Sequence, residues 1–244
     1  MSEPELSLVI PCYNEARNLS MLVDRCRDTM LDDRIEIILV DNGSTDDTQA
    51  VLDSLSVGSG NIRSVRVERN QGYGHGILSG LRAARADILA WTHADMQTDP
   101  ADALKGLALF KEARDPKKLF VKGRRYGRPL GDRIFTAGMS LFESILFAAP
   151  FSDINAQPTM FHRTFFKAWD DPPKDFSLDL YAYYMAHARR LQIRRFPVAF
   201  SERVLGRSHW NVGWRSRMKF IRRTVSYSLE LRRRVWARAR QTAG

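Results

Sequence analysis

The chain has 244 residues, of which 44% are hydrophobic, enough to form one large α/β domain with an extension or two small domains. Its longest nearly uncharged run, residues 134–151, is interrupted by Glu143 and closed by Pro150, so it does not predict a transmembrane helix. The acidic N-terminus leads straight into a predicted strand, which is not the pattern of a secretory signal. Cys12 and Cys26 lack metal-ligand spacing, so we expect a reduced, cytoplasmic compartment.

The formal net charge of +10 is concentrated in the C-terminal part of the chain. Residues 201–244 contain twelve Lys and Arg against Glu202 and Glu230, while residues 1–200 contain 26 basic and 26 acidic side chains. Such a tail indicates an anionic partner, either lipid headgroups or nucleic acid. No recognised nucleic-acid-binding motif accompanies the charge, so we expect no nucleic-acid partner.

Apolar runs and polar turns alternate along the first hundred residues. We expect Pro11 to end the first strand, Asn14 to cap the first helix, and Ser44 with Asp47 to cap the second. Strands that alternate with helices of this length predict βαβ units and a mainly parallel sheet. The predicted strands are residues 6–10, 35–40, 62–67 and 87–90, and the predicted helices are residues 15–30, the segment around Val51–Leu55 and the segment through Ile77–Leu81.

Four polar loops follow these strands: residues 11–15, 41–46, 70–76 and 93–97. Ligands bind at the carboxyl ends of the strands in such sheets, so we expect the loops to converge and form a nucleotide-sized cleft. The glycine-rich segment of the third loop is superficially similar to a dinucleotide fingerprint. It follows the third strand, and the turn after the first strand has no glycine, which argues against a nicotinamide site.

Taken together, the loops resemble those of the family 2 inverting glycosyltransferases, which are nucleotide-sugar-dependent enzymes of the GT-A type. The family's motifs are matched, in order and spacing, by Val9-Ile10-Pro11-Cys12-Tyr13-Asn14-Glu15, Val40-Asp41-Asn42-Gly43-Ser44-Thr45-Asp46, Asn70-Gln71-Gly72-Tyr73-Gly74 and Ala94-Asp95-Met96-Gln97. The resemblance implies hexosyltransferase activity and an α/β GT-A (Rossmann-like) single domain, with a mainly parallel central sheet flanked by helices. We expect this domain over residues 1–205, with a nucleotide-sugar half (1–100) and an acceptor half (101–205), and a basic amphipathic helical extension over residues 206–244.

The resemblance also implies which residues bind the donor, a UDP- or GDP-sugar. These are Pro11, Tyr13, Glu15, Asp41, Asn70, Gly72, Ala94, Asp95, Gln97 and Arg203. Asp95 and Gln97 would bind a divalent Mg²⁺ or Mn²⁺ ion that neutralises the leaving diphosphate. His93 replaces the first residue of the family's common Asp-x-Asp motif, and is either a third metal ligand or a packed strand-end residue. If the segment around Asp95 is considered without the other motifs, it is a polar strand-to-helix loop with Asp95 as an ordinary turn residue.

Within the family, the chain is most similar to the polyprenyl-phosphate sugar synthases, of which dolichol-phosphate mannose synthase is an example. Residues 121–126 resemble their Gly-Ser-Arg-Tyr strand, which makes Arg125 a phosphate-binding candidate. Residues 203–209 resemble their Arg-x-x-Gly-x-Ser-Lys loop, which implies that Arg203 binds the diphosphate.

Further acceptor-binding candidates come from the next segment. Arg133 stands at the entrance of an amphipathic helix expected over residues 134–149. Asp153 keeps the acidic position of the family's Asp-x-x-Ser-Gly-Phe pattern, whereas Ala156-Gln157-Pro158 does not keep the small Ser-Gly pair. The acceptor and the sugar should meet in this part of the chain.

Two kinds of acceptor remain open. A polyprenyl (dolichyl or undecaprenyl) phosphate is already anionic, so Asp95, the metal and the arginines would suffice by positioning and charge stabilisation. A sugar hydroxyl of a glycan or lipid-linked saccharide needs a base, for which Asp179 is the candidate. Asp179 can equally be an acidic residue that stabilises the start of a helix.

The tail favours the lipid acceptor. Apolar residues recur at helical spacing between basic ones, which is typical of a helix lying in a membrane interface, although the same stripe could cover the protein's own core. We therefore expect a peripheral protein on the cytoplasmic face of an anionic membrane. The stripe consists of Trp210, Trp214, Met218, Ile221, Val225 and Leu229.

Overall fold

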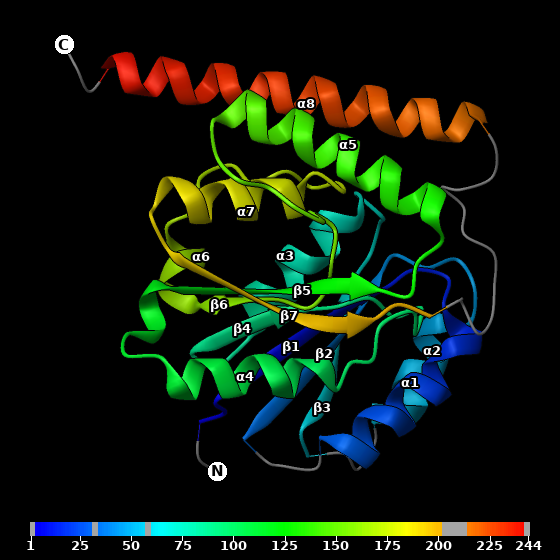
Figure 1. Ribbon diagram of the computed structural model, residues 1–244. Helices are drawn as coiled ribbons and strands as arrows, with labels where there is room; N and C mark the ends of the chain where they lie inside the picture. The colour runs from blue at the N-terminus through cyan, green and yellow to red at the C-terminus, as the bar shows by residue number, and fades with distance from the viewer. Residues whose placement is uncertain (1–2, 31–33, 57–59, 202–213, 242–244) are drawn as a thin grey trace. The chain divides into compact units, whose positions relative to one another are not determined.

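The computed structural model describes residues 3–30, 34–56, 60–201 and 214–241 (Figure 1). The chain divides into two compact units. Unit 1 comprises residues 1–128 and 155–205, and unit 2 comprises residues 129–154 and 206–244. Residues 129–154 therefore group with the C-terminal segment. The domain boundary expected at residue 205 stays a prediction.

Unit 1 is built on a seven-stranded sheet with the order β3-β2-β1-β4-β6-β5-β7. Strand β6 is antiparallel to both of its neighbours, and the remaining neighbouring strands pair in parallel. This confirms the predicted α/β fold with a mainly parallel sheet. The strands are β1 Leu6–Cys12, β2 Ile35–Asn42, β3 Ile62–Val67, β4 Ile88–Trp91, β5 Leu119–Tyr126, β6 Thr159–His162 and β7 Gln192–Ala199.

Helices cover both faces of this sheet (Figure 1). On one face, Leu6, Leu8 and Ile10 of β1 belong to a buried core with apolar residues of α1, α2 and α4. On the other face, α3 lies so close to the sheet that a Cβ on Gly80 would be 2.3 Å from Val9 Cγ1. The helices of unit 1 are α1 Ala16–Thr29, α2 Thr48–Ser56, α3 Tyr73–Ala83, α4 Asp102–Glu112, α6 Arg163–Lys167 and α7 Leu178–Ala188, with a short 3₁₀ helix at Pro116–Lys118.

The first strand continues beyond Pro11, so the prediction that this residue ends it is wrong. Val9 O accepts a hydrogen bond from Thr92 N (3.1 Å) at the end of β4, and Pro11 faces the same side because strand residues alternate. Since β4 ends at Trp91, opposite Val9, no β4 residue is left to pair with Pro11 on that side. The missing N–H of proline therefore costs no ladder hydrogen bond.

The predicted helix caps are also wrong. Asn14 has φ 55°, and its Oδ1 accepts a hydrogen bond from Thr45 N (2.9 Å) rather than from α1. Ser44 Oγ accepts from Asn14 N (3.0 Å), and it is Asp46, whose Oδ1 accepts from Thr48 N (3.0 Å), that caps the start of α2. Asn14 and Ser44 therefore connect two loops instead of capping the helices next to them.

Unit 2 contains two helices in its described part, α5 (Leu130–Phe147) and α8 (Trp214–Gln241). They contact each other, and Ser228 Oγ of α8 donates a hydrogen bond to the buried Glu143 Oε1 of α5 (2.6 Å). No helix among the described residues is both long enough and apolar enough to cross a membrane. The C-terminal helix expected from the sequence is present.

Candidate active site

The loops after β1 and β2 are tied together by backbone-to-side-chain hydrogen bonds. Asn14 bonds with Ser44 and Thr45, and Glu15 N donates to Thr48 Oγ1 (3.0 Å). Tyr13, which immediately precedes these contacts, is 46% exposed, so its ring is available to a ligand. The candidate nucleoside residues after β1 thus stand on a loop held in place by the neighbouring strand end.

The loop after β3 is joined to the same group. Asn42 Nδ2 donates to Gly72 O (3.0 Å), and Gly72 N donates to Asn70 Oδ1 (2.8 Å). Asp41 is 2% exposed, and its Oδ1 accepts from Ser44 N (2.9 Å), so one carboxylate oxygen holds the turn after β2. Four of the predicted donor-site residues therefore lie close together at connected strand ends: Tyr13, Glu15 and Asn70 on loops, and Asp41 at the end of β2.

Gly72 is required by both backbone conformation and space. Its φ is 116°, and a Cβ at this position would lie 2.5 Å from Lys174 O. His75 N donates to the same carbonyl (2.8 Å). The segment that leads into α7 is thereby held against the start of α3. The glycine-rich stretch expected to be a turn is therefore partly helical, because α3 begins at Tyr73.

The loop after β4 carries the predicted metal and diphosphate residues. Asp95 is 7% exposed, and its Oδ1 accepts from Gln97 N (3.2 Å) across Met96, which has φ 56°. Gln97 is bonded to Ser201 in both directions, through Ser201 N to Gln97 O (2.9 Å) and Gln97 Nε2 to Ser201 O (3.3 Å). Ser201 precedes Arg203 by two residues, and Arg203 itself lies outside the described residues.

His93 is the end of a stack of three rings. Its ring centroid is 5.5 Å from that of Tyr73, and Tyr73 stacks on Phe176 at 4.6 Å with an interplanar angle of 10°. Burial lowers the pKa of His93, and the cations of Arg125 and Lys122 act in the same direction, while Asp95 and Asp179 oppose them. The imidazole is therefore neutral at physiological pH, the form in which histidine ligates a metal.

Asp179 lies inside a buried polar network that the sequence did not reveal. Its Oδ1 accepts from Gln157 Nε2 (2.7 Å) and lies 3.5 Å from Lys122 Nζ, and Lys122 also donates to Thr159 Oγ1 (2.6 Å). Lys122 and Gln157 are completely buried and Asp179 is 1% exposed. The available signal was a lysine in an otherwise apolar strand, Leu119–Val121, since a buried lysine needs an anionic partner.

Three further polar atoms are buried next to this network: Tyr73 Oη, Trp91 Nε1 and Gln157 Oε1. Burial raises the pKa of the Tyr73 phenol, as do the Asp179 and Asp95 carboxylates, whereas the nearby Trp91 and Gln157 groups act against them. The phenol therefore stays protonated. Because the charges of Asp95 and Asp179 both raise the pKa of Tyr73, the three side chains lie near one another.

The predicted acceptor residues divide between the units. Arg125 is half-buried at the end of β5, with its guanidinium carbon 5.1 Å from the Phe200 ring centroid. Its positive charge contributes to the lowered pKa of His93. Arg133 is exposed in the first turn of α5, and Asp153 is buried, with its N donating to Ser140 Oγ (3.1 Å). Both belong to unit 2, so their grouping with Asp95 stays a prediction.

The described residues contain no cluster of three or more His, Cys, Asp or Glu side chains suited to a metal ion. Asp95 and His93, with the amide oxygen of Gln97, offer oxygen and nitrogen donors on one loop, a set that accepts Mn²⁺ or Mg²⁺ only with further ligands. Diphosphate oxygens are such ligands. The donors of this loop therefore fit a metal ion that takes its remaining ligands from a bound molecule.

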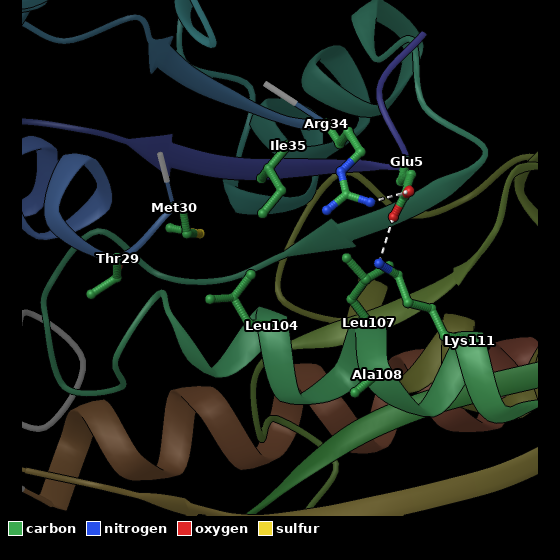
Figure 2. Close-up of a pocket in the computed structure, with 9 residues that line it drawn as sticks. All are labelled: Glu5, Thr29, Met30, Arg34, Ile35, Leu104, Leu107, Ala108 and Lys111. Atoms are coloured by element: carbon green, nitrogen blue, oxygen red, sulfur yellow. Dashed lines mark hydrogen bonds and ion pairs between the residues drawn. The ribbon is translucent and has the colours of Figure 1, made fainter. Parts of the chain in front are cut away.

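A cavity of about 340 Å³ lies at the opposite end of the sheet (Figure 2). Glu5, which precedes β1, bridges Arg34 (3.1 Å) and Lys111 (2.8 Å) on its wall. The remaining lining is largely apolar, from α1, β2 and α4. Its position at the amino end of β1 and β2 separates it from the candidate site.

Comparison with known proteins places the chain among sugar-transferring enzymes. Residues 7–168 match the family described as Glycosyl transferase family 2. The undecaprenyl-phosphate 4-deoxy-4-formamido-L-arabinose transferase of Proteus mirabilis is 30% identical over 116 residues, which are 46% of this chain and 35% of that protein. The dodecaprenyl-phosphate galacturonate synthase of Rhizobium johnstonii is 38% identical over 101 residues, 40% and 30% of the two chains. The match thus spans about a third of these relatives' length.

Solved structures share the fold. Glucosyl-3-phosphoglycerate synthase from Mycobacterium tuberculosis, in complex with Mn²⁺, UDP and glucosyl-3-phosphoglycerate, has a TM-score of 0.70 at 17% identity and covers 94% of this chain and 80% of its own. A mannosyltransferase from Pyrobaculum calidifontis, in complex with GDP-Man and Mn²⁺, has a TM-score of 0.61 at 21% identity and covers 86% and 59%. The GT-A architecture expected from the sequence is confirmed.

Proposed function

Because the chain belongs to glycosyl transferase family 2, we propose that it moves a sugar from a UDP- or GDP-sugar to the phosphate of a polyprenyl carrier, with inversion. The two relatives described above are named for polyprenyl-phosphate acceptors, which supports this acceptor class. A sugar hydroxyl is the competing acceptor, and Asp179 would be its base. Asp179 and Asp95 both influence the pKa of Tyr73 and of His93, so the candidate base lies near the same side chains as Asp95.

The observation that carries the proposal is that Asp179 Oδ1 already contacts Lys122 Nζ and Gln157 Nε2 inside the protein. A general base must reach the acceptor proton and must gain a proton readily. Asp179 is 1% exposed, and its Oδ1 is held inside the protein by Gln157 Nε2 (2.7 Å) and Lys122 Nζ (3.5 Å), contacts that oppose its approach to an acceptor hydroxyl. A phosphate acceptor avoids this requirement, since its attacking oxygen is already anionic.

Donor binding is assigned to the connected loops. Pro11, Tyr13, Glu15, Asp41, Asn70 and Gly72 would bind the nucleoside, and Ala94, Asp95 and Gln97 the diphosphate. Asp95, with His93 and Gln97, would hold a divalent ion, which supplies positive charge to the leaving diphosphate. The neutral state of His93 supports a ligand role.

Catalysis in this proposal consists of positioning and charge stabilisation. Arg203 would bind the diphosphate, and Arg125 and Arg133 would bind the acceptor phosphate, because guanidinium groups match phosphate oxygens in pairs. Asp153 would lie on the acceptor side. The hydrogen bonds between Gln97 and Ser201 support the assignment of Arg203, since they hold the chain two residues before it against the diphosphate loop.

The acceptor class requires access to a membrane, and we place the protein at the cytoplasmic face as a peripheral protein. The support is the positive charge of residues 201–244, which hold twelve basic side chains against two acidic ones. Several basic residues near anionic lipid, at about 1 kcal/mol each, suffice for reversible attachment.

The site assignment is tested with Asp95→Ala and a matched carboxylate deletion away from the site, Asp53→Ala on α2. Transfer from radiolabelled UDP- and GDP-sugars to a short-chain polyprenyl phosphate should fall at least about 100-fold for Asp95→Ala. The control should retain wild-type activity. Equal rates for Asp95→Ala and wild type would refute the site.

The acceptor class is tested with Asp179→Asn. The amide keeps an oxygen for Gln157, so circular dichroism and nucleotide-induced thermal shifts check that the variant is folded. Most transfer activity should remain, within about tenfold of wild type, because no base is removed. A loss of several orders of magnitude in a folded variant that binds nucleotide would favour the hydroxyl acceptor instead.

A further inference from the structure

The ring of Tyr73 contacts the candidate metal residue His93, although the two residues follow different strands. Tyr73 is the first residue of α3, and its ring centroid is 5.5 Å from that of His93 and 4.6 Å from that of Phe176. His93 belongs to the loop after β4, and Phe176 to the segment before α7. Tyr73 is thus the middle ring of a stack that joins three separate segments of unit 1.

The Tyr73 side chain is held at both ends. At its backbone end, the start of α3 is tied to the segment before α7, because His75 N donates to Lys174 O (2.8 Å). At the other end, the Tyr73 hydroxyl is buried beside Trp91 and Gln157. The plane of the Tyr73 ring is therefore fixed by the fold itself.

A histidine that binds a metal must present its ring in a defined orientation, and in known metal sites a neighbouring group sets that orientation. A stacked aromatic ring restrains the imidazole, because turning the imidazole away would lose the contact between the rings. The interplanar angle between His93 and Tyr73 is 24°, which is close enough to parallel for such a restraint. Phe176 supports Tyr73 in the same way, at an angle of 10°.

We infer that Tyr73 is a positioning residue for the divalent ion: its ring orients the His93 imidazole, and Phe176 in turn supports the Tyr73 ring. This inference rests on the proposed function, which makes His93 a metal ligand. It gives the glycine-rich loop after β3 a second role besides nucleoside binding. It also connects the metal residues with the segment that leads into α7, the helix that carries Asp179.

Electron paramagnetic resonance of Mn²⁺, with UDP or GDP present, tests the role of the Tyr73 ring. The signal of free Mn²⁺ gives the affinity of the full chain for the metal. Tyr73→Leu should weaken Mn²⁺ binding at least about tenfold, as expected when a partner that orients a metal-binding histidine is lost. Tyr73→Phe keeps the ring and should stay within about threefold of wild type. Equal affinities for Tyr73→Leu and wild type would overturn the inference.

Tyr183→Leu is the matched control, because Tyr183 also stacks on a phenylalanine and a histidine. Its ring centroid is 5.9 Å from that of Phe120 and 5.2 Å from that of His187. Loss of this second stack should lower the thermal stability of unit 1 but leave the Mn²⁺ affinity within about twofold of wild type. An equal loss of affinity in both leucine variants would assign the effect of Tyr73→Leu to general destabilisation and refute the positioning role.

Phe176→Leu keeps the inference testable if Tyr73→Leu does not fold. Phe176 is 38% exposed, so its replacement removes less buried surface than that of Tyr73. The variant should weaken Mn²⁺ binding about two- to tenfold, because one aromatic pair is lost from the stack. An unchanged affinity would contradict the support that Phe176 gives to Tyr73.

Electron spin echo spectroscopy of the bound Mn²⁺ separates this inference from the proposed function, because it detects a nitrogen ligand directly. Wild type should show nitrogen modulation that His93→Ala loses and that Tyr73→Leu reduces even at saturating Mn²⁺. Wild type that transfers sugar with Mn²⁺ but shows no such modulation would overturn the inference and leave the transfer activity standing. Nitrogen modulation without transfer to any prenyl phosphate would overturn the proposed function alone.

Discussion

Glu36 in unit 1 and Glu143 in unit 2 are both buried glutamates, yet their surroundings shift their pKa in opposite directions. Burial by itself raises the pKa of Glu36, but hydrogen bonds from Ser7, Arg85 and Arg63 more than offset it, and the pKa is lowered overall. Burial raises the pKa of Glu143 to about 7, because among the described residues only Ser228 opposes it and Glu143 Oε2 has no hydrogen-bond partner.

The two units differ in the partners that surround these buried carboxyl groups. Unit 1 surrounds its buried carboxylates with cations and donors, at Glu36 and again at Asp179 beside Lys122. In the described part of unit 2, the Glu143 carboxyl between α5 and α8 has a single hydroxyl donor, Ser228. The first arrangement gives each carboxylate cationic partners, at the amino end of β2 for Glu36 and next to the candidate site for Asp179. The second makes the contact between α5 and α8 depend on pH.

The largest effect on stability is expected from Lys122→Met, which removes the cation of unit 1's most buried pair. Asp179 would remain buried with an uncompensated charge, which costs about 3–5 kcal/mol of unfolding free energy. Urea denaturation at pH 7 measures it. Lys105→Met is the matched control, because Lys105 forms a closer pair with Asp102 (2.7 Å) but is 64% exposed, and its loss should cost under about 1 kcal/mol. Similar costs for both variants would refute the special role of the buried pair.

The next largest effect is expected at Glu143, where a substitution should raise the free energy of unfolding instead of lowering it. A folded-state pKa raised to about 7 from 4.5 means that unit 2 is most stable below about pH 4.5 and loses stability as the pH rises to about 7. Glu143→Gln keeps an oxygen for Ser228 and removes the charge, so at pH 8 it should stabilise the α5–α8 pair by about 2–3 kcal/mol.

Hydrogen exchange of the α5 amides at pH 5 and pH 8 measures this prediction. The advantage of Glu143→Gln over wild type should shrink at pH 5, where wild-type Glu143 is already mostly protonated. An equal effect of the substitution at both pH values would show that Glu143 does not titrate near neutrality.

A smaller effect is expected from Glu36→Gln in unit 1. The lowered pKa means that the stability from this carboxylate is present above about pH 4.5 and is lost as the pH falls through the folded-state pKa. The variant should lose about 1–2 kcal/mol at pH 7, because Arg63 and Arg85 are partly solvated and their attraction is screened.

Thermal or urea unfolding across pH 3–7 distinguishes the two glutamates. The difference between wild type and Glu36→Gln should disappear toward low pH, whereas that for Glu143→Gln should grow toward high pH. A pH-independent difference for Glu36→Gln would assign its effect to packing rather than to charge.

The alternation of strands and helices was predictable because each buried strand is a short apolar run bounded by polar turns. Leu6–Ile10 and Ile35–Val40 are examples, and both lie inside strands of the structure. The convergence of loops followed from the rule that parallel strands end at one edge, and the bonds from Asn14 and Asn42 across those loops agree with it. What each polar residue does within a loop was not predictable, since Asn14 is as good a helix cap in sequence as it is a loop connector.

The sequence by itself determined the fold and the family, because periodicity and four loop motifs are local properties of the chain. It also determined the charge of the tail. Only the tertiary structure decided that Lys122 and Gln157 bind Asp179, because the three residues come from separate segments that meet where β5, β6 and α7 pack. It likewise decided which helix exposes its apolar face. A helix with apolar and polar sides can be drawn from sequence, but whether the apolar side is covered depends on what packs against it, and on α5 the side packed against α8 is the one that carries Glu143.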